Sequence, residues 1–129
     1  MKTILFAALL SLGAAAVRAD VYVIANPATA VSPDDVVDIF TGEKQLAGSV
    51  KLVPMDNAAV QDEFLAKALH LNVARYNAVW TKKAFREGLG ARPVRSGDAE
   101  VARIVRSTPG AVGYVSAPVD GVKLVQRYR

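Results

Sequence analysis

The hydrophobic and polar positions follow two different periods along this chain. Four short runs rich in β-branched and aromatic residues predict strands, at residues 20–25, 50–53, 111–115 and 122–127. Between these runs, apolar residues recur at spacings of three and four, which predicts helices that bury one face. Strands that alternate with helices indicate an α/β fold, with a small mixed sheet flanked by helices.

The first helix is expected to begin at Ser32. Ser32, Pro33 and Asp35 supply a cap, a first-turn proline and an acid at the third position. Gly42 is the expected C-terminal stop. The predicted inward face consists of Val36, Ile39 and Phe40. The following strand, residues 50–53, is expected to be closed by Pro54.

Two more helices are predicted in the middle of the chain. The first is expected to start at Asp56 or Asn57, with Val60, Phe64, Ala68 and Leu69 on its buried face. The second is expected to be capped by Asn72 and to stop at Gly88, with Val73, Tyr76, Trp80 and Ala84 buried. Aromatic residues at this spacing usually pack in a core, so Trp80 is interpreted as a core residue and not as a ligand platform.

The segment from residue 95 to residue 116 predicts a helix, a turn and a buried strand in quick succession. Ser96 or Asp98 is expected to cap the helix. Its apolar stripe is formed by Val101, Ile104 and Val105. Pro109 and Gly110 end it, and Gly113 within the following strand indicates a close backbone approach or a bulge.

Three motifs carry a resemblance to a known family. Thr-Pro-Gly-Ala-Val-Gly-Tyr-Val at 108–115 resembles the Pro-Gly-Ala-Ile-Gly-Tyr-Val signature of periplasmic phosphate-binding proteins, the substrate-binding components of phosphate ABC transporters. Asp-Ile-Phe-Thr-Gly-Glu-Lys at 38–44 is similar to the family's Ile-Phe-x-Gly-Lys element, and Tyr76, Asn77 and Trp80 match its Tyr-Asn-x-x-Trp pattern. The resemblance covers roughly residues 21–125 and corresponds to one lobe of a two-lobed family. It implies a single lobe of a type II periplasmic-binding-protein-like fold.

The resemblance implies a non-enzymatic protein that binds phosphate or another small oxyanion and serves a membrane transporter or a sensor protein. The family's phosphate loop runs Arg-x-x-x-Ser-Gly-Thr, whereas the matching segment here, residues 56–64, is shorter and lacks all four of those residues. Without them the loop has no arginine fork and no hydroxyl donors for phosphate. The alternative is therefore a degenerate lobe that serves as a periplasmic interaction or sensor-accessory module without a ligand. Whether two copies pair as a homodimer to rebuild a cleft stays open.

The starts of predicted helices are the places where the sequence offers donors to an anion, because free N–H groups and the helix dipole meet there. The candidate ligand-binding residues are Asn57, Arg92, Arg95, Ser96 and Gly97. Asp98 opposes this interpretation, since a carboxylate in the first turn competes with an incoming anion. The alternative for this segment is a capped helix with solvated arginines.

Other chemistry finds little support in the sequence. The single histidine, His70, is expected to interact with a helix dipole at a C-terminus, and no catalytic motif is found. The chain has no cysteine, and nothing in it calls for a metal or another cofactor. Lys82, Lys83 and Arg86 form a basic cluster that is either a solvated face or a docking surface for an acidic partner or anionic lipid.

Residues 1–19 have the pattern of a signal peptide. Lys2 gives a positive start, residues 4–16 an apolar stretch, and Val-Arg-Ala at 17–19 a cleavage site. An uncleaved anchor is the alternative. Cleavage would leave one periplasmic domain, residues 20–129, with 14 basic and 12 acidic residues in place of 16 and 12. Such a small positive excess makes nucleic acid a poor partner.

Overall fold

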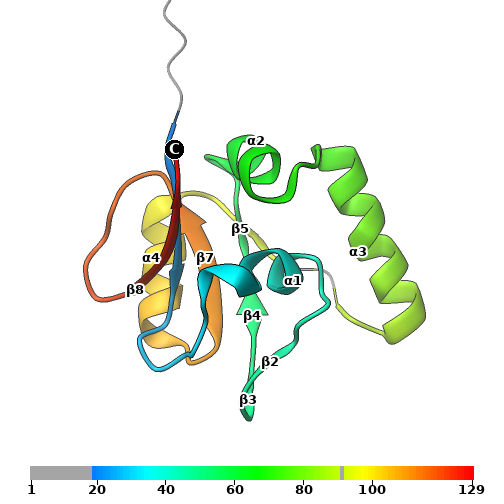
Figure 1. Ribbon diagram of the computed structural model, residues 1–129, viewed down its shortest axis with the longest axis horizontal. Helices are drawn as coiled ribbons and strands as arrows, with labels where there is room; N and C mark the ends of the chain where they lie inside the picture. The colour runs from blue at the N-terminus through cyan, green and yellow to red at the C-terminus, as the bar shows by residue number, and fades with distance from the viewer. Residues whose placement is uncertain (1–18, 91) are drawn as a thin grey trace, which may run out of the picture.

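A four-stranded mixed sheet lies at the centre of the molecule, and the computed structural model describes residues 19–90 and 92–129 (Figure 1). The strand order is β4-β7-β1-β8, with bounds Val53–Pro54, Ala111–Val115, Val21–Ala25 and Lys123–Tyr128. Strands β7 and β8 both run antiparallel to β1, whereas β4 runs parallel to β7. The predicted α/β class with a small mixed sheet is confirmed.

Both faces of this sheet are apolar and are covered by helices. Helix α4 (Asp98–Ser107) covers one face, where Ile24 and Val115 pack with Val101 and Val105. The opposite face packs against the other helical segments, and its largest buried side chains include Phe40, Phe64, Tyr76 and Tyr114. Because successive strand residues point to opposite faces, β1 and β7 supply both clusters at once.

Gly113 lies where α4 approaches the sheet closely. A Cβ atom at this position would be 2.7 Å from Cγ1 of Val101 and 3.2 Å from Cγ of Met55. Residue 113 therefore has room for a hydrogen only, and the predicted close approach is confirmed.

The segment after β1 follows the predicted start and stop signals. The backbone N–H of Ser32 donates to the carboxylate of Asp35 at 3.0 Å, and a 3-10 turn, η2 (Pro33–Asp35), leads into α1 (Val36–Phe40). All three predicted inward residues are buried. Gly42 has a φ of 80°, in the region that favours glycine, and ends the element as expected. A short hairpin follows, formed by β2 (Leu46–Ala47) and β3 (Val50–Lys51).

Two boundaries differ from those that the sequence predicts. The run at 50–53 is not one strand closed by Pro54, because Pro54 itself lies in β4 and pairs with Val112. This proline is tolerated because β4 is at the edge of the sheet. The helix predicted to begin at Asp56 or Asn57 starts only at Gln61.

Asp56 and Asn57 instead form β5 (Asp56–Asn57), which pairs parallel with β6 (Val94–Arg95). Both side chains are fully buried, and the Asp56 carboxylate is bonded to distant residues. Nδ2 of Asn57 donates to Asp98 and Tyr114, while its Oδ1 accepts the N–H of Ala59 at 2.9 Å in the turn that precedes the helix. The helical segment comprises α2 (Gln61–Phe64) and the π-helical η3 (Leu65–Leu69), and it ends at His70 in a left-handed conformation. The four apolar residues predicted for its inner face are buried.

Helix α3 (Val73–Glu87) stands at the side of the molecule opposite α4 (Figure 1). Its predicted ends are confirmed, since Oδ1 of Asn72 accepts the N–H of Arg75 at 2.9 Å and Gly88 adopts a φ of 67°. Of the four residues predicted to be buried, Tyr76 and Trp80 are, whereas Val73 and Ala84 are exposed. Only a narrow strip of α3 meets the body, so a wide face of the helix stays in solvent.

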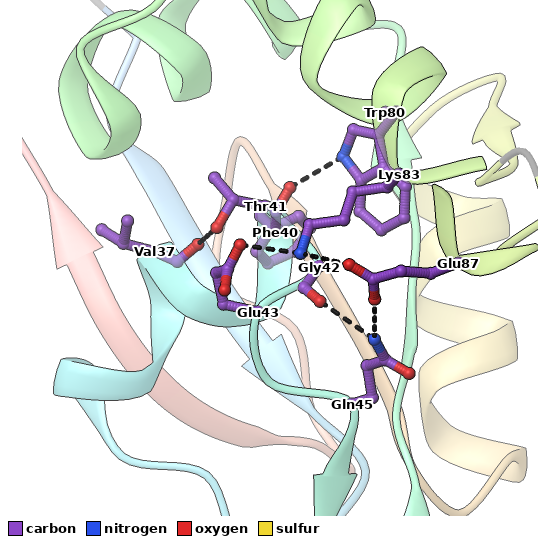
Figure 2. Close-up of polar contacts among 9 residues, drawn as sticks. All are labelled: Val37, Phe40, Thr41, Gly42, Glu43, Gln45, Trp80, Lys83 and Glu87. Carbon is purple, nitrogen blue, oxygen red and sulfur yellow. Dashed lines mark hydrogen bonds and ion pairs between the residues drawn. The ribbon is translucent and has the colours of Figure 1, made fainter. Parts of the chain in front are cut away.

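A polar cluster fastens α3 to the end of α1 (Figure 2). The indole N–H of Trp80 donates to the carbonyl oxygen of Phe40 at 2.9 Å, which confirms Trp80 as a core residue. Beside it, Nζ of Lys83 lies 2.7 Å from a carboxylate oxygen of Glu43 and 3.0 Å from one of Glu87. Lys83, one of three residues in the predicted basic cluster, is thus an anchor between α3 and the loop after α1.

The N-terminal segment predicted as a signal peptide lies outside the described residues, apart from Ala19. Within residues 19–90 and 92–129, no helix is long and apolar enough to cross a membrane.

Candidate functional site

The buried carboxylate of Asp56 is the centre of a connected polar cluster. Its oxygens accept hydrogen bonds from Oη of Tyr114 at 2.7 Å, Oη of Tyr76 at 3.0 Å and Nε of Arg92 at 2.7 Å. The Asp56 side chain is fully buried, and the Arg92 side chain is 9% exposed. We call these four residues the Asp56 cluster. Since a buried charge needs a partner, each of the two ions holds the other in place.

Two aromatic rings, that of Tyr76 in the cluster and that of Trp80 beside it, also hold the arginine. The guanidinium carbon of Arg92 lies 4.1 Å from the ring centroid of Tyr76 and 5.1 Å from that of Trp80. Burial and the neighbouring Asp56 charge raise the pKa of both Tyr76 and Tyr114 well above the usual range for tyrosine. Both phenols therefore remain protonated hydrogen-bond donors.

A second carboxylate, that of Asp98, occupies the start of α4. It accepts the N–H of Ser116 at 3.0 Å, the hydroxyl of Ser116 at 2.6 Å and Nδ2 of Asn57 at 2.8 Å. The other Nδ2 hydrogen of Asn57 goes to the carbonyl oxygen of Tyr114 at 3.0 Å. Asp98 therefore connects α4 to the end of β7 and to β5.

A third carboxylate, that of Glu100, binds the residues that precede α4. It accepts both the N–H and the hydroxyl of Ser96, at 2.9 Å and 3.1 Å, and it forms an ion pair with Arg95 at 3.6 Å. The Ser96 amide, its hydroxyl and the Arg95 charge lower the pKa of Glu100. The predicted cap is wrong: the residue at the cap position is Gly97, because Ser96 is engaged by Glu100 and Asp98 by Ser116.

The five candidate ligand residues thus lie in β5, in or just before β6, and in the turn that leads into α4. Four of them donate to, or pair with, a carboxylate of the same chain: Asn57 with Asp98, Arg92 with Asp56, and Arg95 and Ser96 with Glu100. Gly97 contributes only its backbone. An anion arriving here meets three fixed negative charges beside donors that are mostly used: the side-chain donors of Asn57 and Ser96 are bonded, whereas Nε of Arg95 is buried without a hydrogen-bond partner among the described residues.

The sequence pattern does not reveal the acceptors of this site. It indicates Asp56 as a helix cap and Tyr114 as part of a fold signature. Glu100 follows Ser96 by four residues, and this spacing could have indicated the contact. No such signal exists for Ser116, which meets Asp98 only through the fold.

Other residues singled out in the sequence lie apart from this site. His70 is exposed at the end of η3. Lys82 and Arg86 are exposed on α3. Within the part of the chain that the structure describes, no group of three or more histidine, cysteine, aspartate or glutamate side chains is placed to hold a metal ion.

Comparison with known proteins identifies similarity at the level of the fold. No family model matches the sequence, and no curated protein matches it. A solved structure described as a putative phosphate ABC transporter substrate-binding protein from Clostridium perfringens, with bound phosphate, is similar at a TM-score of 0.60 and 17% identity. An ABC-type phosphate transport receptor from Vibrio cholerae is similar at a TM-score of 0.60 and 16% identity.

Each comparison covers 84% of this chain but only 45% and 47% of the two neighbours, so the chain spans less than half of their length. This chain forms a small mixed sheet flanked by helices, as predicted. The chain therefore has the fold of a single lobe of a type II periplasmic-binding-protein-like structure.

Proposed function

We propose that this chain is a binding-protein lobe whose anion donors are held by its own carboxylates, and that it works as a non-enzymatic interaction module in the periplasm. The observation that carries the proposal is the position of Asp98. Its carboxylate uses three donors, two from Ser116 and one from Asn57, at the start of a helix where an oxyanion would bind.

The physical argument is one of competition. A phosphate ion at the start of α4 would have to displace Asp98 or lie beside its charge, and Glu100 adds a second negative charge on the same turn. Like charges at close range disfavour binding. If phosphate displaced the Asp98 carboxylate, the donors of Ser116 and Asn57 would lose their present acceptor and would have to form new hydrogen bonds. Hydrogen bonds to an ionised acceptor are stronger than neutral ones, which makes phosphate contacts strong in other proteins. Here the carboxylates of the protein itself are the ionised acceptors.

A second candidate function is weak oxyanion binding at the same place. Two observations favour it: one structural neighbour holds phosphate, and the Arg95 side chain is 34% exposed beside α4. With its donors shared, such a site is expected to bind phosphate no tighter than about millimolar, which corresponds to roughly −4 kcal/mol. Its affinity should fall as salt screens the arginine.

Isothermal titration calorimetry with inorganic phosphate tests both candidates. The wild-type protein is expected to show no binding tighter than millimolar, whereas Asp98→Asn, which removes the competing charge, should bind more tightly than wild type. Asp38→Asn on the exposed surface of α1 removes the same charge away from the site and serves as the control. Micromolar binding by the wild-type protein, insensitive to salt, would contradict the proposal.

The proposal includes export to the periplasm. Mass spectrometry of periplasmic protein should show a chain that starts at Asp20 or within a few residues of it. A full-length mass in the membrane fraction would contradict cleavage and favour the anchor.

A further inference from the structure

One side of helix α3 combines an exposed aromatic ring with a row of cations. Arg75, Val79, Lys82 and Arg86 follow one another at spacings of four, three and four, so they lie on one side of the helix. Phe85 follows Lys82 by three residues at the edge of this surface, is 93% exposed, and lines a separate hollow with Trp80 and Thr81. We call these five residues together with Ala78 the α3 face.

Three cations of the α3 face are not used within the described molecule. Arg75, Lys82 and Arg86 form no ion pair and no side-chain hydrogen bond with any residue in 19–90 or 92–129. The nearby carboxylates of Glu43 and Glu87 are both bound to Lys83 (Figure 2). The two carboxylates nearest α3 therefore form their ion pairs with the inward Lys83. The outer row of cations faces solvent and is accessible to a partner.

The α3 face is hollowed. A groove runs beside the helix with an apolar floor formed by Leu71, Ala78 and Val79, and the cations line it. Glu43 and Glu87 lie at its inner wall, where Lys83 pairs with both and offsets one of their two negative charges, so that with Arg75, Lys82 and Arg86 the groove still carries a positive excess. A groove with an apolar floor and a cationic rim is complementary to a narrow segment that carries acids on its edge and an apolar residue at its centre.

We propose that the α3 face binds an acidic amphipathic segment of a partner protein. The partner is expected to place carboxylates against Arg75, Lys82 and Arg86 and an apolar side chain on the floor of the groove, with Phe85 at the edge of the contact beside the groove. This inference rests on the proposed function only in that an interaction module needs a partner. It does not depend on whether the start of α4 binds phosphate.

A membrane surface fits the α3 face less well than a protein segment does. Helices that lie in a bilayer interface carry several bulky apolar side chains on the face opposite their cations. Here Phe85 is the one large exposed apolar residue next to the row in the described chain, since Val79 is half-buried in the groove. The concave floor also suits a helix or an extended strand better than a flat lipid surface.

The test uses a short synthetic peptide with glutamates one helical turn apart along one edge of a leucine stripe, and a second peptide of the same composition in scrambled order. Fluorescence anisotropy at low salt with the purified protein should show the patterned peptide binding about tenfold more tightly than the scrambled one, a difference of about 1.4 kcal/mol. Lys82→Glu/Arg86→Glu should lose about tenfold or more of this affinity. Phe85→Ser should also weaken it, at unchanged charge.

Lys51→Glu/Arg103→Glu is the matched control, because it reverses two exposed cations on other elements and should leave peptide binding unchanged. All variants change exposed side chains, and their melting temperatures should match that of the wild type. Equal binding of the two peptides, or binding unaffected by Lys82→Glu/Arg86→Glu, would overturn the proposal. So would binding only to phosphatidylglycerol vesicles, or a concentration-dependent dimer that is lost in the Lys82→Glu/Arg86→Glu variant. Phosphate calorimetry on the same samples reports separately on the start of α4.

Discussion

Asp56→Asn is the substitution that tests the architecture of the site most directly. The new side chain has nearly the same size but no charge, so it keeps the packing and removes the partner of Arg92. The Oδ2 atom of Asp56 accepts from Arg92 and from Tyr76, while Oδ1 accepts from Tyr114 and, at 3.2 Å, also from Tyr76. An amide must place its NH₂ group at one of these two positions.

Of the two positions, only the one facing Tyr114 is tolerable. A guanidinium cannot accept a hydrogen bond, whereas a phenol can rotate its hydrogen and accept one. The introduced amide would therefore turn its oxygen to Arg92 and reverse the bond to Tyr114. What remains uncompensated is the charge of Arg92, whose side chain is 9% exposed.

Removing one partner of a buried ion pair typically costs about 3–5 kcal/mol. The rings of Tyr76 and Trp80 still stabilise the cation, so we expect the loss to lie near ~3 kcal/mol, or a fall in melting temperature of roughly 12 °C or more. Urea titration followed by circular dichroism measures this loss. Asp38→Asn, at an exposed position, should change stability by less than about 0.5 kcal/mol.

A double-mutant cycle with Arg92→Met separates the ion pair from general disruption. If the two residues act together, Asp56→Asn/Arg92→Met should lose at least about 1 kcal/mol less than the sum of the single losses. Additive losses, or an Asp56→Asn protein within about 1 kcal/mol of wild type, would refute the reasoning that this pair holds β5, β6 and α3 together.

Three other substitutions test separate features. Trp80→Ala should cost roughly 3–5 kcal/mol as a large-to-small core change, and thermal melts should show it with no specific effect on phosphate binding. Gly113→Ala should cost about 1–3 kcal/mol because its Cβ would overlap Val101, whereas Gly97→Ala, with open space around it, should cost little. Glu100→Gln should make the free energy of unfolding depend less on pH at the acid end. The pKa of Glu100 is lower in the folded state than in the unfolded state. Its contribution to stability is therefore present above the ordinary glutamate pKa and is lost as the pH falls through the lowered value. An unchanged acid limb would contradict the role assigned to Glu100.

The parts of the fold that could be predicted from sequence are those whose causes are local. Ser32 with Asp35, Asn72 with Arg75, and the glycines at 42 and 88 act within one helical turn of their own position. The buried strand at 111–115 was predictable because a central strand covered on both faces is apolar throughout.

The errors occur where distant residues decide the local structure. Asp56 and Asn57 look like helix caps, but Tyr114, 58 residues beyond Asp56, donates to the first and accepts from the second. Val73 and Ala84 lie at the correct period for a buried stripe, yet only a narrow part of α3 meets the body. Periodicity shows that a helix has an apolar side, and it cannot show how much of that side the rest of the chain will cover.

The fold signature at 108–115 and the polar groups at the start of α4 involve different residues. The residues that form the core can therefore stay the same while the polar groups at the start of α4 differ. Tyr114 belongs to the signature, and its ring stacks on Phe64 at 4.0 Å while its hydroxyl donates to Asp56. These are packing contacts, and the protein needs them whether or not a ligand binds. Asp98 and Phe85 lie outside the signature, and neither contributes to the apolar core clusters. Substitutions at the start of α4 and on the α3 face would therefore alter the two proposed surfaces without removing a residue from the apolar core.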